Sequence, residues 1–124
     1  MSTPFSEELA LTSKNNEAIY EVIYLSVETE TGSVPMDLTG REFFAQARRA
    51  KAKDSDLMCD ISVEIYGDPL DGALLLSVSD TVMSTVDPGK GFYDVLTRAG
   101  PTSPIDNIYM APFIVESGVS TWQP

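Results

Sequence analysis

The sequence contains no histidine, which removes the commonest general base and metal ligand of proteins. Without histidine, the serines and Cys59 have no partner of the kind that activates a nucleophile in catalytic triads and dyads. The segment Gly89-Lys90-Gly91 is too short for a phosphate-binding loop, and no serine or threonine follows it. We therefore predict that the protein is not an enzyme and that it holds no cofactor.

Cysteine is nearly absent as well. Cys59 is the only one, so the chain forms no internal disulfide and does not have the pattern of a disulfide-stabilised secreted module. Because Cys59 lies at an alternating apolar position, we expect it to be a buried structural thiol.

Basic residues are few. Eight lysines and arginines face 19 acidic residues, which gives a formal net charge of −11. This charge repels nucleic acids and anionic membranes, so neither is expected as a direct partner. The one basic cluster, Arg48 to Lys53, lacks interleaved aromatic residues and is predicted to be an exposed charged loop. An inhibitor that imitates DNA with its carboxylates remains a weaker alternative.

Long apolar runs are missing too. No segment approaches the roughly 20 apolar residues that a membrane-spanning helix needs. Residues 1–8 have neither the basic region nor the apolar run of a signal peptide. We therefore expect the protein to be made and folded in a cytosol.

Acidic pairs are present and could be read as calcium ligands or as paired catalytic carboxylates. Asp54 lies near Asp56, and Asp68 lies near Asp71. The segment from Asp68 to Gly72 lacks the alternating ligand order and the final glutamate of a calcium-binding loop. We predict that these aspartates stabilise turns and that the chain holds no metal ion.

Alternation of apolar and polar residues dominates the rest of the chain. It is clearest where Leu57, Cys59, Ile61, Val63 and Ile65 are expected to point inward. This strand and residues 73–78 are predicted to form a hairpin. Pro112 indicates an edge position or a bulge in the last strand. Further strands are predicted at 18–27, 41–48, 92–97 and 108–116, a turn at 34–40, and a short helix at 79–86 capped by Ser79 or Asp80.

This pattern predicts an all-β fold, an antiparallel β-sandwich of Greek-key type with about six or seven strands and one short helix. Residues 1–16 are expected to form an N-terminal arm or edge segment, residues 17–117 the sandwich, and residues 118–124 a C-terminal tail. Most aromatic residues are expected in the core: Tyr20, Tyr24, Phe43, Phe44, Phe92, Tyr93, Tyr109 and Phe113.

A series of short motifs runs along residues 18–116. It consists of Asp37-Leu38-Thr39-Gly40, Ala45 to Arg48, Gly72 to Ser77, Pro88-Gly89 and Phe92 to Val95. In this series the chain resembles the immunoglobulin-like N-terminal domain of phage baseplate upper proteins, small virion proteins of tailed phages. It departs from that pattern by an extra glycine before Phe92 and by the residues around Trp122. The resemblance implies an immunoglobulin-like fold and a role as an attachment or adaptor module.

The expected function is therefore a structural component of a bacteriophage virion, made in the host cytoplasm. It would bind other capsid or tail proteins and further copies of itself. Phe5 and Trp122 are the candidate anchors on such partners, because large aromatic residues near polar chain ends are costly to leave in water. Loose terminal residues are the alternative for both. The competing function is a carbohydrate-binding or receptor-binding module.

Overall fold

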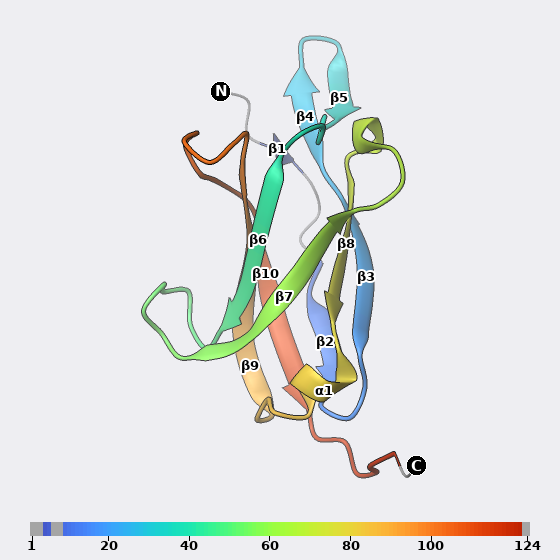
Figure 1. The fold of residues 1–124 in the computed structure, drawn as a ribbon, viewed down its shortest axis with the longest axis vertical. Helices are drawn as coiled ribbons and strands as arrows, with labels where there is room; N and C mark the ends of the chain where they lie inside the picture. Colours follow the sequence, from blue (N-terminus) through green and yellow to red (C-terminus); the bar gives the residue numbers. More distant parts are fainter. Residues whose placement is uncertain (1–3, 6–8, 123–124) are drawn as a thin grey trace.

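The computed structural model describes residues 4–5 and 9–122, which form an almost entirely β structure (Figure 1). Its elements in chain order are β1 Pro4–Phe5, β2 Leu11–Lys14, β3 Ile19–Tyr24, β4 Ser26–Thr29, β5 Gly32–Pro35, β6 Glu42–Arg48, β7 Leu57–Ile65, the 3₁₀ helix η1 Pro69–Asp71, β8 Ala73–Val78, α1 Asp80–Met83, β9 Gly89–Arg98 and β10 Asp106–Glu116. No helix within the described ranges is long and apolar enough to cross a membrane.

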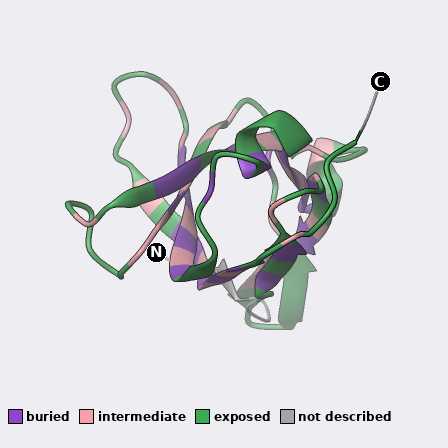
Figure 2. Cartoon of the chain, turned by 90° about the horizontal axis from the view of Figure 1, so that it is seen from below, coloured by how far each residue is buried: buried purple, intermediate pink, exposed green. Residues whose placement is uncertain are grey.

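Seven strands form one mixed sheet in the order β2-β10-β9-β6-β7-β8-β3. Strand β2 pairs parallel with β10, and the other neighbours pair antiparallel. The sheet curls until it is almost closed, so that its interior looks like a barrel when viewed end-on (Figure 2). A small second sheet, β1-β4-β5, lies at one end. The all-β class with one short α-helix is confirmed, but the strands do not form two clearly separate antiparallel layers.

Strand β7 is the reason that the sheet is continuous. Its first part, Leu57–Ile61, pairs with β6, and its second part, Ser62–Ile65, pairs with β8. The predicted hairpin with β8 is therefore confirmed, and the same strand also pairs with β6. One strand belongs to both halves of the curled sheet.

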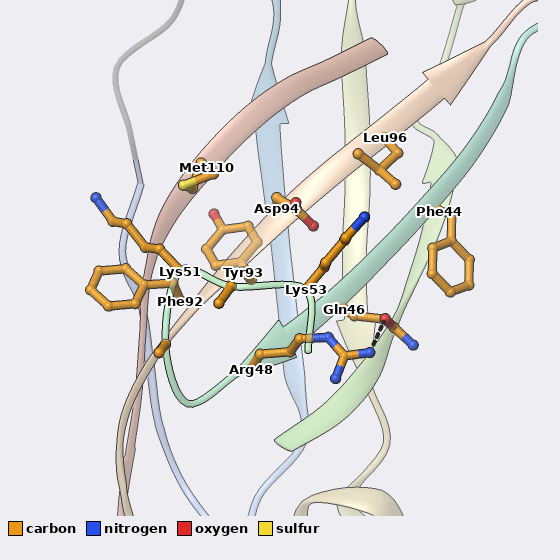
Figure 3. A pocket seen from close by; sticks show the side chains of 12 residues that line it. Phe44, Gln46, Arg48, Lys51, Lys53, Phe92, Tyr93, Asp94, Leu96 and Met110 are labelled. Atoms are coloured by element: carbon orange, nitrogen blue, oxygen red, sulfur yellow. Dashed lines mark hydrogen bonds between the residues drawn. The ribbon is translucent and has the colours of Figure 1, made fainter. Parts of the chain in front are cut away.

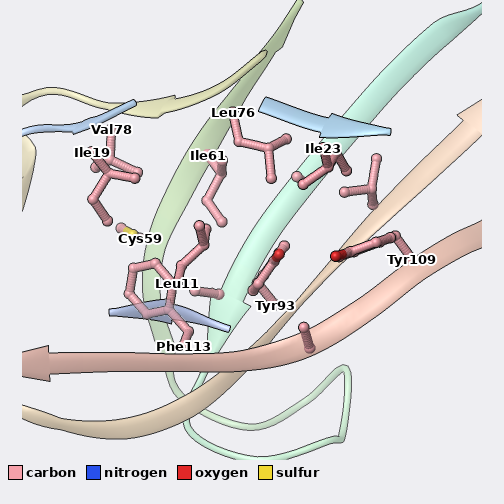
Figure 4. Packing of buried hydrophobic residues seen from close by; sticks show 14 of the residues in the cluster. Leu11, Ile19, Ile23, Cys59, Ile61, Leu76, Val78, Tyr93, Tyr109 and Phe113 are labelled. Carbon is pink, nitrogen blue, oxygen red and sulfur yellow. The ribbon is translucent and has the colours of Figure 1, made fainter. Parts of the chain in front are cut away.

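The core fills the inside of this curl (Figure 4). Tyr93 from β9 packs against Tyr109 and Phe113 from β10, with ring centroids 5.9 and 6.4 Å apart. Leu38, from the predicted turn at 34–40, is fully buried. Its amide donates a hydrogen bond of 2.9 Å to the carbonyl of Pro69. This turn therefore closes one end of the core.

The predicted inward face of β7 is correct at Cys59 and Ile61 and wrong at Leu57. Leu57 is 47% exposed, and its neighbour Met58 is buried instead. The pairing with β6 shifts by one residue between Ala47 and Arg48, and such an irregularity moves side chains to the opposite face. The inward pattern thus begins at Met58.

The strand predicted at 18–27 is divided into β3 and β4, which belong to different sheets. Leu25 lies between them and is buried. Its amide donates to the carbonyl of Gly72 at 2.7 Å, and its carbonyl accepts from the amide of Met36 at 2.9 Å. Gly72 has a φ of 69°, and a Cβ there would lie 2.4 Å from the Leu25 carbonyl oxygen. Close backbone packing therefore ends β3 at this point.

The edge position predicted from Pro112 is wrong, because β10 lies between β2 and β9. The pairing of β10 with β2 begins only at Phe113, opposite Leu11. At Pro112 itself, the side of the strand that faces β2 has no partner in the ladder. Proline, which has no amide hydrogen, is therefore tolerated in an inner strand.

Helix α1 agrees with the prediction. Ser79 caps it, since its hydroxyl accepts a hydrogen bond of 3.2 Å from the amide of Val82. Met83 and Val86 point into the core, while Val82 is 39% exposed.

Candidate partner-binding site

A pocket of about 200 Å³ lies on the outer surface of the sheet, between β6, β9 and the loop 49–56 (Figure 3). We call it the basic pocket. Its lining residues are Phe44, Gln46, Arg48, Ala50, Lys51, Ala52, Lys53, Phe92, Tyr93, Asp94, Leu96 and Met110.

Strand register brings the polar and aromatic residues of the basic pocket together. On β6, alternation directs Phe44, Gln46 and Arg48 outward. The antiparallel pairing of β6 with β9 places these residues opposite Leu96, Asp94 and Phe92 respectively. Cross-strand partners share one face of a sheet, so the six side chains form a continuous floor.

The loop 49–56 is held over this floor by hydrogen bonds. The guanidinium of Arg48 donates to the Ser55 carbonyl at 2.7 Å and to the Gln46 side-chain oxygen at 3.1 Å. The hydroxyl of Ser55 donates to the carbonyls of Ala50 and Ala52, at 3.0 and 2.6 Å. Arg49 closes the loop through its amide, which donates to the Asp56 carbonyl at 2.9 Å. The wall of the pocket is therefore an ordered loop.

Positive charge gathers at this pocket. The ammonium groups of Lys51 and Lys90 lie 4.9 and 5.8 Å from the centroid of the Phe92 ring. With Arg48 and Lys53, four of the eight basic residues of the chain border the site. In the described part of the structure, ion pairs involve only Arg41 and Arg98 among the arginines and lysines, so Lys51, Lys53 and Lys90 have no acidic partner there.

Asp94 is the one acidic residue in the lining. Burial raises the pKa of its carboxyl, against the opposing effects of a hydrogen bond from Asn107 and the charge of Arg48. The Asn107 amide donates to Asp94 at 2.8 Å. The site thus combines cations, one half-buried carboxylate and aromatic surface, which suits a ligand with both a negative charge and apolar groups.

A second hollow of about 320 Å³ adjoins the basic pocket and shares Phe44 and Leu96 with it. Phe43, Thr97 and Ile105 also line it. Phe44 is 54% exposed and Ile105 is 62% exposed. Glu42 and Arg98, which form an ion pair of 2.8 Å, line it as well, so the two hollows make a strip along β6 and β9 that contains both apolar and charged side chains.

The sequence prediction was correct for some residues around the basic pocket and wrong for others. The basic cluster does form a loop, and residues 50–54 are exposed as expected. Phe44, Tyr20 and Tyr24 were expected in the core, and this is wrong, since all three are more than half exposed. The missed signal was in the alternation of β6, which puts Phe44 on the same side as Gln46 and Arg48.

The two predicted anchors lie at opposite ends of the molecule (Figure 1). Phe5 belongs to β1, opposite Ser26, and its side chain lies outside the described part of the structure. Trp122 is 91% exposed, and Val119 nearby is 99% exposed. The tail is held by Gly118, whose amide donates to the Asn15 side chain at 2.8 Å, and by Ser120, whose carbonyl accepts from Asn16 at 2.9 Å.

The acidic pairs are found in turns. Asp68 caps η1, because its carboxylate accepts a hydrogen bond of 2.9 Å from the amide of Leu70. Its predicted turn role is confirmed. Within residues 4–5 and 9–122, no three residues of the types that bind metals are grouped closely enough to hold an ion.

Comparison with known protein families finds no matching family model, and a search of curated proteins finds no match either.

Proposed function

We propose that the protein is a structural adaptor subunit of a bacteriophage virion, which binds other capsid or tail proteins. The resemblance in the motifs between residues 18 and 116 supports this role. The observation that carries the proposal is the placement of large apolar side chains outside the core. Trp122 and Val119 are almost fully exposed, and Phe44 and Ile105 border a surface strip. Exposed aromatic residues of this kind commonly anchor protein partners.

The fold supports the same proposal. We propose that the curled sheet is a variant of an immunoglobulin-like sandwich in which two layers share β7. One layer would then be β2-β10-β9-β6, and the other β8-β3. Such a sandwich would offer outer sheet faces and terminal segments for contacts.

Mass spectrometry of purified phage particles, with the stoichiometry measured, tests this function directly. We expect the protein in finished particles at a fixed copy number. Abundance in infected cells together with absence from particles would overturn the proposal.

Trp122→Ala tests the anchor. Because the indole is exposed, the variant should keep the melting temperature of the isolated protein within a degree or so and lower its incorporation into particles. Tyr66→Ala is the matched control, since Tyr66 is another exposed aromatic residue, at 51%. A parallel fall in melting temperature would show that Trp122 stabilises the fold instead.

The alternative function, a carbohydrate-binding or receptor-binding module, is favoured by the lining of the basic pocket. Phe44 could stack on the apolar face of a sugar, and Gln46 and Asp94 could accept or donate hydrogen bonds to its hydroxyls. A glycan array with the wild type and Phe44→Ala tests this role. Binding that Phe44→Ala abolishes and Tyr66→Ala retains would support it, and no binding to any glycan would exclude it for that panel.

A further inference from the structure

The basic pocket has a complementary surface at the opposite end of the same chain. Strands β4 and β5 form a hairpin that projects away from the curled sheet (Figure 1). Its tip carries Glu28 and Glu30, and both are exposed. We call residues 28–31 the acidic tip.

Hydrogen bonds fix the conformation of the acidic tip. The hydroxyl of Thr29 donates to the Gly32 carbonyl at 2.6 Å, which tightens the turn. Ser33 donates to the Glu28 carboxylate at 2.8 Å. The Glu30 carboxylate makes no hydrogen bond or ion pair with any residue that the structure describes. One carboxylate is therefore oriented and the other is free to bind a cation.

The basic pocket favours an anion for an equally specific reason. Lys51 and Lys90 both place their ammonium groups near the Phe92 ring, at 4.9 and 5.8 Å from its centroid. Lys51 and Lys53 both line the pocket, and neither has an acidic partner in the described part of the structure, so both would attract a carboxylate bound there.

We propose that the acidic tip of one copy of this protein binds in the basic pocket of the next copy. The proposal rests on the role of the chain as an assembly subunit and names a second copy as its partner. Because tip and pocket are different surfaces, the contact is head-to-tail, and repeated contacts form a ring or a chain.

The net charge of −11 opposes this association at low salt. The Debye length is about 10 Å at 0.1 M salt, so distant charges are screened while charges in direct contact still attract. Association should therefore be strongest at moderate ionic strength and weak again near 1 M salt.

Sedimentation velocity over a concentration series at about 0.15 M salt tests the proposal. The wild type should associate reversibly. Lys51→Glu and Glu30→Lys should each raise the dissociation constant about tenfold or more, because each replaces an attraction with a repulsion. The double variant Lys51→Glu/Glu30→Lys should recover association, since the two charges are exchanged and the net charge is unchanged.

Two single variants control for net charge alone. Lys14→Glu changes the charge as Lys51→Glu does, and Glu64→Lys changes it as Glu30→Lys does. Lys14 and Glu64 are both exposed and lie outside the pocket and the tip. Neither control should weaken association.

A wild type that stays monomeric at all concentrations would overturn the proposal. So would controls that act like the pocket and tip variants, or a double variant that fails to recover. Particle incorporation is measured separately, so the adaptor role can hold even if this contact does not. Glycan binding abolished by Lys51→Glu, without self-association, would instead assign the pocket to a sugar.

Discussion

Burial changes the acidity of the Cys59 thiol. Cys59 is 5% exposed on β7, and burial, aided by the charge of Asp60, raises the pKa of its thiol to about 11. The thiol therefore stays protonated and unreactive in the folded protein at neutral pH. The sequence prediction of a buried structural thiol is confirmed.

The raised pKa predicts how stability depends on pH. Below about pH 9 the thiol is protonated in both the folded and the unfolded chain and contributes no pH dependence. Between about pH 9 and 11 only the unfolded chain loses the proton, so the unfolded state gains stability as the pH rises. Thermal melts of the wild type and Cys59→Ala from pH 8 to 11 should show the difference in melting temperature narrowing. A constant difference would contradict the prediction.

Truncation of Leu38 is expected to have a larger effect on stability. Its side chain is fully buried at the end of the core, so truncation would leave a cavity there. Leu38→Ala should lower the free energy of unfolding by about 2–5 kcal/mol, measured by urea denaturation.

Leu70→Ala is the matched control, because Leu70 lies on the adjacent η1 and is 60% exposed. Equal losses for the two variants would show that the turn at Leu38 does not close the core. The sequence indicated the turn from Pro35, Asp37 and Gly40, but nothing in the pattern marked Leu38 as part of the core.

At the scale of elements, the contact between β9 and the end of β6 depends on a glycine. A Cβ at Gly91 would lie 2.2 Å from the Arg48 carbonyl oxygen and 2.5 Å from the sulfur of Met58. The Arg48 oxygen belongs to the backbone and cannot move aside easily. The glycine that departs from the family resemblance therefore has a packing role.

Gly91→Ala should lower the free energy of unfolding by about 1–3 kcal/mol, the usual cost of overpacking. It should also disturb the loop 49–56, which begins where the clash occurs. Gly100→Ala is the control, since a Cβ there would meet only the Ser103 hydroxyl, at 3.7 Å. Chemical denaturation compares the two variants, and equal stability would contradict the close packing at Gly91.

Local patterns predicted most elements and few of their partners. The alternation in 57–65 and the Ser79 cap identified β7 and α1, because each depends on neighbouring residues only. The division at Leu25 depends on hydrogen bonds with Gly72 and Met36, which are distant in sequence. The basic pocket was not predicted because it also depends on residues that are distant in sequence, through the register between β6 and β9.

At the scale of the whole molecule, the charge balance predicts solubility. The isoelectric point calculated from the sequence is about 4.1. Acidification toward this value removes the net charge that keeps copies apart, while Trp122 and Val119 remain exposed. Light scattering between pH 7 and 3.5 should show a solubility minimum near pH 4, and unchanged scattering would contradict it.

The parallel pairing of β2 with β10 ties residues 11–14 to residues 113–116, the first and last strands of the curled sheet. During translation β2 is made before the other strands of that sheet, and its only neighbour in the sheet is made after all of them. Leu11 therefore has no partner strand in this sheet until residues 113–116 have also been synthesised. Closure of the curled sheet along β2 therefore needs residues from both ends of the described part of the chain.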